Sequence, residues 1–394
     1  MKRISAIASK SDAHRALICA ALSEKSCNVI FNTTSDDIKA TEKCLRALRE
    51  GRSEMYCGES GSTLRFLLPV MGALGIKADF YPEGRLPMRP LSPLYEEMER
   101  MGCSLSPAGE VPFKVRGRLR AGTYNIPGNI SSQYISGLLF ALPLIDGDSY
   151  IKITGRLESQ NYVKMTLNTI RTFGIEIEEK SDGFFVRGNQ KYSGPDKYIV
   201  EGDWSNAAFI LAAGAITGEN VLLTGLNRDS LQGDKEIVNV LKSFGAGISF
   251  TEDGVAIEKG NLRGIEIDAG QIPDMVPAIS AVAAFAEGKT VVNNAGRLRI
   301  KESDRLKAIR ETVNALGGRV TELEEGLVIE GTGKLKGGEV SSYGDHRIAM
   351  MAAVCSLFSE EKVVINGADA VKKSYPGFYE DFEKAGFAAN IERK

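Results

Sequence analysis

Six segments of the chain combine a short polar head with a long apolar tail. They begin at Ser11, Ser60, Ser131, Asp203, Ile272 and Gly344, so their starts are separated by 49, 71, 72, 69 and 72 residues. The tails are rich in Ala, Leu, Ile and Met on all sides of a helical period, which is typical of helices buried in a core. We therefore predict six buried helices at equivalent places in a repeated unit.

A second set of helices is amphipathic and ends in glycine. Segments of this kind end at Gly102, Gly174, Gly245, Gly317 and Gly386. Glycine is favoured just past a helix because it adopts left-handed backbone angles without strain. Because the first four lead into short alternating strands, the chain is predicted to be six repeats of one α/β unit of roughly 70 residues. Six repeats divide naturally into two lobes of three, with a boundary near residue 200.

Composition narrows the class of protein. The chain has 394 residues, 43% hydrophobic and 25% charged, as in a soluble globular protein of two or three domains. A formal net charge of -2 gives no bulk reason to expect nucleic acid or a membrane as partner. The six cysteines have no zinc spacing and are typical of reduced thiols. No apolar leader and no run of about 18 apolar residues occurs. These features predict a cytoplasmic enzyme or binding protein.

The polar heads could bind anions. A helix N-terminus offers unpaired N–H groups and the positive end of the helix dipole. For any single Ser or Asp in a head, capping is the simpler role. Arg15, Arg65 and Arg347 are different, because each lies within the first turns of an apolar helix, where an unpaired guanidinium group is costly to bury. Either a bound phosphate or carboxylate or an internal Asp would satisfy each of them, and both alternatives stay open.

A charged segment between residues 297 and 307 adds a third feature. It could be a solvated helix start with pairs between Lys301 and Asp304 and between Glu302 and Arg305. The same alternation of acids and bases also suits charge stabilisation together with proton transfer. From the residues alone, we expect an enzyme with a cleft that acts on small polyanions.

The motifs resemble those of the 5-enolpyruvylshikimate-3-phosphate synthase family over nearly the whole chain. They read SKSDAHRAL, GESGSTLR, GRLPMRPL, GNISSQYISGLL, RLESQNYVKMTL, IPDMVP, RIKESDRL, YGDHRIAM and KKSYPGFY, in family order. The resemblance implies a two-domain inside-out α/β barrel in which each domain has three βαβαββ repeats, with buried helices and outer sheets. It also implies domains at 9–200 and at 1–8 with 201–394, and an active site in the cleft between them.

The resemblance further implies a reaction without a metal or organic cofactor. The 5-hydroxyl of shikimate 3-phosphate adds to C2 of phosphoenolpyruvate while C3 gains a proton, and the tetrahedral intermediate then loses a C3 proton and phosphate. The enzyme is expected to be a cytoplasmic monomer in the shikimate pathway, with these two small molecules as its partners. Neither nucleic acid nor a membrane is expected.

Residue roles carry over by motif. Asp274 is the expected base, Glu302 the expected proton donor to C3, and Lys10 the third catalytic residue. Shikimate 3-phosphate is expected at Lys10, Ser11, Arg15, Ser131, Ser132, Gln133, Ser159, Tyr162, Asp274 and Lys301. Phosphoenolpyruvate is expected at Lys10, Gly61, Arg89, Gln133, Arg305, Arg347 and Lys373. His346 is expected to position Arg347 or cap its helix. Arg297 replaces an Asn that often contacts shikimate in the family, so that contact is not transferred.

Two rival functions remain. The sister enolpyruvyl transferase acting on UDP-N-acetylglucosamine generally has a reactive Cys shortly before the arginine that matches Arg89. No Cys lies between Gly75 and Arg89, which argues against this rival. A non-catalytic polyanion-binding protein built on the same repeats is the second rival. Asp274 and Glu302 argue against it, because carboxylates beside the ligand would weaken a simple anion binder.

Overall fold

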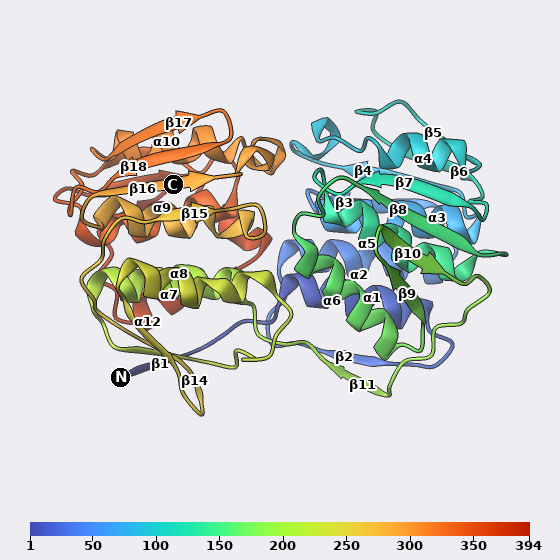
Figure 1. Ribbon diagram of the computed structural model, residues 1–394, viewed down its shortest axis with the longest axis horizontal. Helices are drawn as coiled ribbons and strands as arrows, with labels where there is room; N and C mark the ends of the chain where they lie inside the picture. The colour runs from blue at the N-terminus through green and yellow to red at the C-terminus, as the bar shows by residue number, and fades with distance from the viewer. The chain divides into compact units, whose positions relative to one another are not determined.

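The chain folds into two compact units in the computed structural model, which describes residues 1–394 (Figure 1). Unit 1 comprises Met1–Ser9 with Glu201–Lys394, and unit 2 comprises Lys10–Val200. The motifs implied boundaries between residues 8 and 9 and between residues 200 and 201, and the units of the structure divide between residues 9 and 10 and between residues 200 and 201. Each unit is an inside-out α/β barrel, as the motifs implied, with its most apolar helices enclosed and its sheets outside.

Four repeats have the full βαβαββ order. In each of them, the first two strands are parallel and joined through a helix. The fourth strand is antiparallel to both the second and the third strand. The order across each sheet is therefore first, second, fourth, third. In unit 2 they are β3 (Glu54–Gly58), α3 (Gly61–Leu74), β4 (Ala78–Pro82), α4 (Leu94–Arg100), β5 (Cys103–Leu105) and β6 (Phe113–Gly117), then β7 (Thr123–Pro127), α5 (Ser132–Ala141), β8 (Ser149–Thr154), α6 (Gln160–Thr172), β9 (Ile177–Lys180) and β10 (Gly183–Val186).

Unit 1 holds the other two full repeats. They are β1 (Lys2–Ser5), α7 (Trp204–Thr217), β12 (Val221–Thr224), α8 (Ile237–Phe244), β13 (Gly247–Phe250) and β14 (Gly254–Glu258), then β15 (Glu266–Asp268), α9 (Val276–Phe285), β16 (Lys289–Asn293), α10 (Arg305–Ala315), β17 (Arg319–Leu323) and β18 (Gly326–Glu330). The order across both sheets repeats that of unit 2. One strand and helix pattern therefore serves both units.

Two repeats are shorter than the βαβαββ pattern. In unit 2, α1 (Lys10–Leu22), β2 (Asn28–Ile30) and α2 (Asp36–Arg49) are completed only by β11 (Lys197–Ile199). In unit 1, β19 (Gly338–Ser341), α11 (His346–Cys355), β20 (Val363–Asn366), α12 (Phe378–Lys384) and β21 (Ile391–Arg393) form a three-stranded parallel sheet. Both therefore lack the antiparallel strand pair of the full repeats.

The repeats next to the two chain crossings have exchanged their first strands. In a regular repeat, the strand before a buried helix pairs with the strand after it, as β3 pairs with β4 around α3. Here β1 precedes α1 but pairs with β12 of unit 1, and β11 precedes α7 but pairs with β2 of unit 2. In Figure 1, dark blue β1 lies with the strands of unit 1, and green β11 lies beside blue β2. The two places where the chain passes from one unit to the other, after β1 and after β11, therefore each follow a strand that is held in a sheet.

The six predicted buried helices are confirmed as α1, α3, α5, α7, α9 and α11. All ten residues of α11 are buried, and α7 is buried except at Thr217. The amphipathic helices α2, α4, α6, α8, α10 and α12 expose one face. Glycine ends several helices, as predicted; Gly245, for example, follows α8 with φ of 100°. Because the buried helices lie at the centre of each unit, their polar heads gather at one end of it.

Candidate active site

The serines at two helix heads of unit 2 act as caps. The Ser60 hydroxyl accepts from the backbone N–H of Thr63 at 3.3 Å, and the Ser131 hydroxyl accepts from Gln133 at 3.3 Å. Capping was the simpler expectation for such residues. It still leaves the positive end of each helix dipole at the head, which favours anions there.

Arg15 is buried in unit 2 among uncharged acceptors. Its side chain donates from Nε to Thr166 Oγ1 at 2.9 Å, and from its terminal nitrogens to the backbone oxygens of Ser11 at 2.6 Å and Tyr162 at 2.9 Å. Burial lowers the pKa of Arg15 to about 10. No carboxylate contacts Arg15 directly, although the buried Asp12 one turn earlier in α1 opposes the lowering of its pKa. A bound anion would therefore stabilise this guanidinium group.

Lys10 is ion-paired within unit 2. Its Nζ lies 2.8 Å from Oδ2 of Asp37, and the two side chains are only 15% and 13% exposed. Asp37 lies in the first turn of α2, where an acidic residue is explained by the helix dipole alone. Sequence reasoning therefore missed Asp37 as the partner of Lys10.

A second cluster joins the heads of α3 and α5. Gln133 accepts from Arg65 through Oε1 at 3.2 Å and donates to Ser62 through Nε2 at 2.8 Å. A Cβ atom at Gly61 would lie 2.5 Å from Nη1 of Arg65 and 3.0 Å from Nη1 of Arg89. A side chain at position 61 would therefore displace two guanidinium groups that approach the backbone closely. The cluster concentrates positive charge at the start of α3.

Ser132 and Ser159 are buried at the remaining heads of unit 2. Ser159 precedes α6 with φ of 51° and ψ of 39°. This left-handed conformation costs a residue other than glycine roughly 1–2 kcal/mol, and such strain is concentrated at functional positions. One turn later, the carbonyl group of Tyr162 holds Arg15. The segment that begins at Ser159 thus contributes directly to the Arg15 site.

A buried chain of hydrogen bonds connects α1, α2 and α3. His14 Nδ1 lies 2.7 Å from Thr41 Oγ1, Thr41 lies 2.6 Å from Thr63, and the Thr63 hydroxyl donates to Ser60 at 2.7 Å. Because Thr63 donates to Ser60, it accepts from Thr41, and Thr41 in turn accepts from Nδ1–H of His14. Burial holds the pKa of His14 well below its ordinary value, so the imidazole is neutral. His14 therefore helps to position the cap of α3.

Arg305 holds three carboxylates together in unit 1. It is the first residue of α10 and is 1% exposed. It donates to Asp345 from Nε at 2.8 Å, to Asp274 from Nη1 at 2.8 Å and to Glu302 from Nη2 at 2.7 Å. Burial alone would lower the pKa of Arg305, but the three carboxylates outweigh it and raise that pKa above its ordinary value. The expected pair of Glu302 and Arg305 is thus present, but it lies in the interior.

Asp345 connects this cluster to α11. Its Oδ1 accepts from the backbone N–H of Arg347 at 3.0 Å, which caps the helix, and its Oδ2 accepts from the Ser303 hydroxyl at 3.0 Å. The carboxylate is fully buried. Asp345 belongs to the polar head that begins at Gly344, and the sequence alone assigned it no role in the site. Its position two residues before Arg347, at the start of an apolar helix, was the available signal.

Asp274 lies between three cations in unit 1. Its carboxylate is 2.8 Å from Arg305, 3.5 Å from Lys301 and 3.5 Å from Arg347. Burial alone would raise the pKa of Asp274, but Lys301, Arg347 and Arg305 hold it well below its ordinary value. Arg347 also donates to the Ser205 hydroxyl at 2.6 Å, at the head of α7. Asp274 is therefore ionised and its orientation is held by its neighbours.

Lys301 does not form the expected pair with Asp304. It lies before α10, after the short helix η5 (Gly296–Ile300), and pairs with Asp274 instead. Asp304 caps α10 and pairs with Arg299 at 3.1 Å. Burial lowers the pKa of Lys301, and the nearby Asp274 opposes that shift. The loop conformation, which directs Lys301 away from the helix, explains the changed partner.

Lys373 and His346 lie close to the head of α11. Lys373 ends the short helix η7 (Ala368–Lys373) and donates to the backbone oxygen of Gly344 at 2.6 Å. His346 is the first residue of α11 and is 2% exposed. Nearby, Arg297 donates to the backbone oxygen of Gly270 at 2.7 Å, in the loop that leads to Asp274. Arg297 thus supports that loop.

The predicted residues divide between the units. In unit 2, one connected cluster contains Ser11, Arg15 and Tyr162, and another contains Gly61, Arg89 and Gln133, while Lys10, Ser131, Ser132 and Ser159 lie at helix heads. Unit 1 brings Asp274, Lys301, Glu302, Arg305 and Arg347 into one ion-paired network, with Lys373 beside α11. No group of three or more His, Cys, Asp or Glu residues is arranged to hold a metal ion, and no helix is long and apolar enough to cross a membrane.

Known proteins share this sequence and fold. The family model of EPSP synthase (3-phosphoshikimate 1-carboxyvinyltransferase) matches residues 2–55 and 50–382. The 3-phosphoshikimate 1-carboxyvinyltransferases of Clostridium acetobutylicum and Clostridium kluyveri are 47% and 44% identical to the chain, and each alignment covers 96% of it and 93% of the relative. The solved EPSP synthase of Acinetobacter baumannii has a TM-score of 0.80 at 26% identity, over 98% of this chain and 95% of that one.

A more distant structure shares the fold alone. The enolpyruvyl transferase NikO from Streptomyces tendae has a TM-score of 0.78 at 17% identity, over 98% of this chain and 95% of that one. The family model and the curated relatives define the class of the chain as a carboxyvinyl (enolpyruvyl) transferase, and its two-unit fold agrees. Within that class, the chain belongs to the EPSP synthase (3-phosphoshikimate 1-carboxyvinyltransferase) family, and it is an enzyme.

Proposed function

We propose that the chain transfers the enolpyruvyl group of phosphoenolpyruvate to the 5-hydroxyl of shikimate 3-phosphate and releases phosphate. The observation that carries the proposal is the Arg305 network, in which Asp274 and Glu302 contact one buried cation at 2.8 and 2.7 Å. Two carboxylates placed beside fixed cations suit a reaction that both moves protons and stabilises anions. The names of the relatives supply the acceptor, 3-phosphoshikimate, and the carboxyvinyl group.

The proposed addition step uses Asp274 as the base. The nearby cations keep its carboxylate ionised, so it can accept the proton of the 5-hydroxyl as that oxygen bonds to C2 of phosphoenolpyruvate. Glu302 gives a proton to C3 in the same step. Phosphate and carboxylate groups that bind to Lys301 and Arg305 would offset the positive charge near Glu302 and favour its protonated form.

The elimination step reverses the proton transfer at C3. The tetrahedral intermediate loses a C3 proton to a carboxylate, the C–O bond to phosphate breaks and the double bond returns. Every proton is transferred by a side chain and no electrons are gained or lost, so the proposal includes no metal or organic cofactor. Lys10 assists as the third catalytic residue, because its ammonium group would stabilise charge on both substrates.

The proposed binding roles follow the chemistry of the two units. Unit 2 supplies most contacts to shikimate 3-phosphate, with Lys301 and Asp274 as contributors from unit 1; its residues are Lys10, Ser11, Arg15, Ser131, Ser132, Gln133, Ser159 and Tyr162. Phosphoenolpyruvate is assigned to Lys10, Gly61, Arg89, Gln133, Arg305, Arg347 and Lys373. Arg15 supports this division, because it is buried without a carboxylate partner.

The proposal also covers the setting in which the enzyme works. We assign it to the cytoplasm and to the monomeric state, acting in the shikimate pathway. All six cysteines are free and five are buried, which fits a reducing compartment. Light scattering at working concentrations tests the monomer, and a stable dimer would contradict it.

Phosphate release tests the proposed reaction. The purified chain is mixed with phosphoenolpyruvate alone, with shikimate 3-phosphate alone and with both together. We expect phosphate only in the third mixture, with an equal amount of the enolpyruvyl product by mass spectrometry. A fourth mixture replaces shikimate 3-phosphate with UDP-N-acetylglucosamine. Release in that mixture, and not in the third, would assign the chain to the rival transferase; release in neither would overturn the proposed activity.

A further inference from the structure

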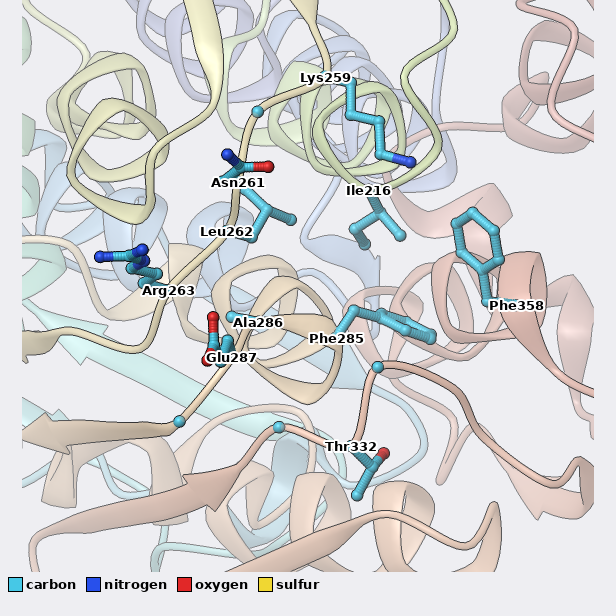
Figure 2. A pocket seen from close by; sticks show the side chains of 14 residues that line it. Ile216, Lys259, Asn261, Leu262, Arg263, Phe285, Ala286, Glu287, Thr332 and Phe358 are labelled. Carbon is cyan, nitrogen blue, oxygen red and sulfur yellow. The ribbon is translucent and has the colours of Figure 1, made fainter.

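Unit 1 contains a second hollow at the far end of its buried helices. It has a volume of about 650 Å³ and is lined by Ile216 at the end of α7, by Phe285 at the end of α9 and by Phe358 in η6 (Ser356–Phe358), which follows α11 (Figure 2). The volume lies within the range of about 300–1,000 Å³ that is typical of small-molecule sites. The candidate catalytic residues lie at the opposite ends of the same helices. Because helices of this length span roughly 15–20 Å, the hollow is a separate place.

Two phenyl rings form an apolar wall of the hollow. The ring centroids of Phe285 and Phe358 are 5.9 Å apart, with their planes inclined at 59°. Phe358 is 41% exposed, and Leu262 and Ile216 extend the apolar surface. In Figure 2 both rings lie on the same side of the hollow as Ile216. A flat apolar ligand would cover this wall, and aromatic contacts add about 0.5–1.5 kcal/mol to the burial of area.

The segments that follow the last strand of each full repeat carry an apolar residue that packs on the core in both units. The segments that follow β6 and β10 place Leu119 and Tyr192 in the core, 3% and 1% exposed, and Tyr192 donates to the backbone oxygen of Phe140 near the end of α5 at 2.9 Å. The corresponding segments of unit 1 place Leu262 and Leu335 against the core, where Leu262 is partly buried and Leu335 is 1% exposed. Unit 1 carries Gly333 where unit 2 has Gln190. A Cβ atom at Gly333 would meet nothing within 4 Å. Gly333 thus leaves open space beside the hollow.

Lys259 makes the aromatic side of the hollow positive. Its carbon stem packs on Gly218, the cap of α7, where an added Cβ would lie 2.6 Å from Lys259 Cβ. Figure 2 shows its ammonium group directed to the side of Ile216 and Phe358. Lys259 makes no ion pair. Arg263 and Glu287, one cation and one anion, are joined by a backbone β-bridge and line the other side of the hollow.

We propose that this hollow binds a small planar aromatic carboxylate. The ring system would lie against Phe285 and Phe358, and the carboxylate would bind the Lys259 ammonium group. An aromatic amine would be repelled by Lys259, and a neutral aromatic molecule would gain only the apolar contact. The proposal is independent of the proposed enzymatic activity, because it concerns a different end of unit 1.

Isothermal titration calorimetry with 2-naphthoate and 2-naphthamide tests the charge requirement. We expect the wild-type chain to bind 2-naphthoate about tenfold more tightly than 2-naphthamide, because only the acid makes a charge-assisted contact. Lys259→Met keeps the apolar stem and should reduce the affinity for the acid to that for the amide. Lys289→Met, on the exposed edge of β16 and outside the hollow, is the matched control and should bind both as the wild type does.

Two further variants locate the bound probe. Phe358→Ala should lower the affinity for 2-naphthoate and for 2-naphthamide by the same factor, because it removes only apolar contact. Arg347→Met alters the cations at the other ends of the helices and should leave 2-naphthoate binding unchanged. Equal affinity for acid and amide, no saturable binding, or loss of binding in Arg347→Met with retention in Lys259→Met would each overturn the proposal. Circular dichroism of every variant verifies its folding, and phosphate release is not used as a readout.

Discussion

Arg15 in unit 2 and Arg305 in unit 1 are buried alike but stabilised in opposite ways. Arg15 is 2% exposed and donates to a hydroxyl and two carbonyl groups, whereas Arg305 is 1% exposed and contacts three carboxylates. The pKa of Arg15 is lowered to about 10, and that of Arg305 is raised. The second guanidinium group thus contacts its counter-charges directly, whereas Asp12 acts on the first without contacting it.

This difference separates two kinds of chemistry in one repeated architecture. A buried cation without a carboxylate gains most from a bound phosphate, so unit 2 is suited to holding an anion. A cation surrounded by carboxylates is already compensated, and it holds those carboxylates in place as acids and bases. The repeats therefore provide equivalent helix heads that differ in whether acids contact the buried arginine, and under the proposed function this difference separates binding from proton transfer.

Removing each arginine gives the largest contrast. Arg305→Met leaves three buried carboxylates without their cation and should destabilise unit 1 by about 3–5 kcal/mol. Arg15→Met removes hydrogen bonds from a charged donor to neutral acceptors and should cost unit 2 less, about 1.5–3 kcal/mol. Trp204 is the single tryptophan and is buried in unit 1, so its fluorescence during urea unfolding measures the stability of unit 1. Circular dichroism during the same unfolding measures the stability of unit 2. If both variants lose the same free energy of unfolding, the surroundings of Arg15 and Arg305 do not differ in the way proposed.

Neutralising the Glu302 carboxylate should leave unit 1 able to bind substrate but slow to react. Glu302→Gln keeps a hydrogen-bond acceptor beside Arg305 but cannot supply the proton to C3. We expect turnover to fall about a hundredfold or more, which corresponds to about 2.7 kcal/mol of barrier, while both substrates still bind. The rate of phosphate release and titration calorimetry measure the two effects. Glu330→Gln, exposed on β18, is the control; a Glu302→Gln variant with normal turnover would remove Glu302 from its role.

The hydroxyl chain in unit 2 is the next point to test. Thr41→Val keeps the shape but interrupts the chain from His14 to Ser60. It should cost about 1–2 kcal/mol, because two buried polar groups lose their partner. Thr41→Ser retains the hydroxyl group and should stay close to the wild type in unfolding experiments. If valine and serine behave alike, the chain does not contribute to the position of the α3 cap.

The smallest effect is on the acid side of the stability profile of unit 1. The folded-state pKa of Asp274 is depressed, so its stabilising contribution is complete above its unfolded pKa of about 4 and is lost as the pH falls below that value. One such group changes the stability by at most about 1.4 kcal/mol per pH unit. Asp274→Asn should flatten the dependence of the Trp204 unfolding midpoint between pH 4 and the lower folded pKa. If the wild type and Asp274→Asn show the same pH dependence of the unfolding midpoint, other carboxylates determine the loss of stability in acid.

The pattern of apolar residues was enough to predict the fold. Helices such as α7 and α11 are apolar on all sides, so their burial follows from composition alone. The exchange of β1 and β11 could not be predicted in this way, because both strands are short and pair with partners about 170 to 220 residues away, at Asn28–Ile30 and Val221–Thr224. The loss of the antiparallel pair in two repeats also escaped prediction.

The amino-acid sequence by itself determined the six repeats, the buried helices and the residue types at their heads, because periodicity and composition are local properties of the chain. Only the tertiary structure decided which heads are compensated by acids. Asp274, Glu302 and Asp345 come from three segments and meet at Arg305, whereas no carboxylate reaches Arg15. Electrostatic energy depends on distances of a few ångströms between residues far apart in sequence, and packing alone sets those distances.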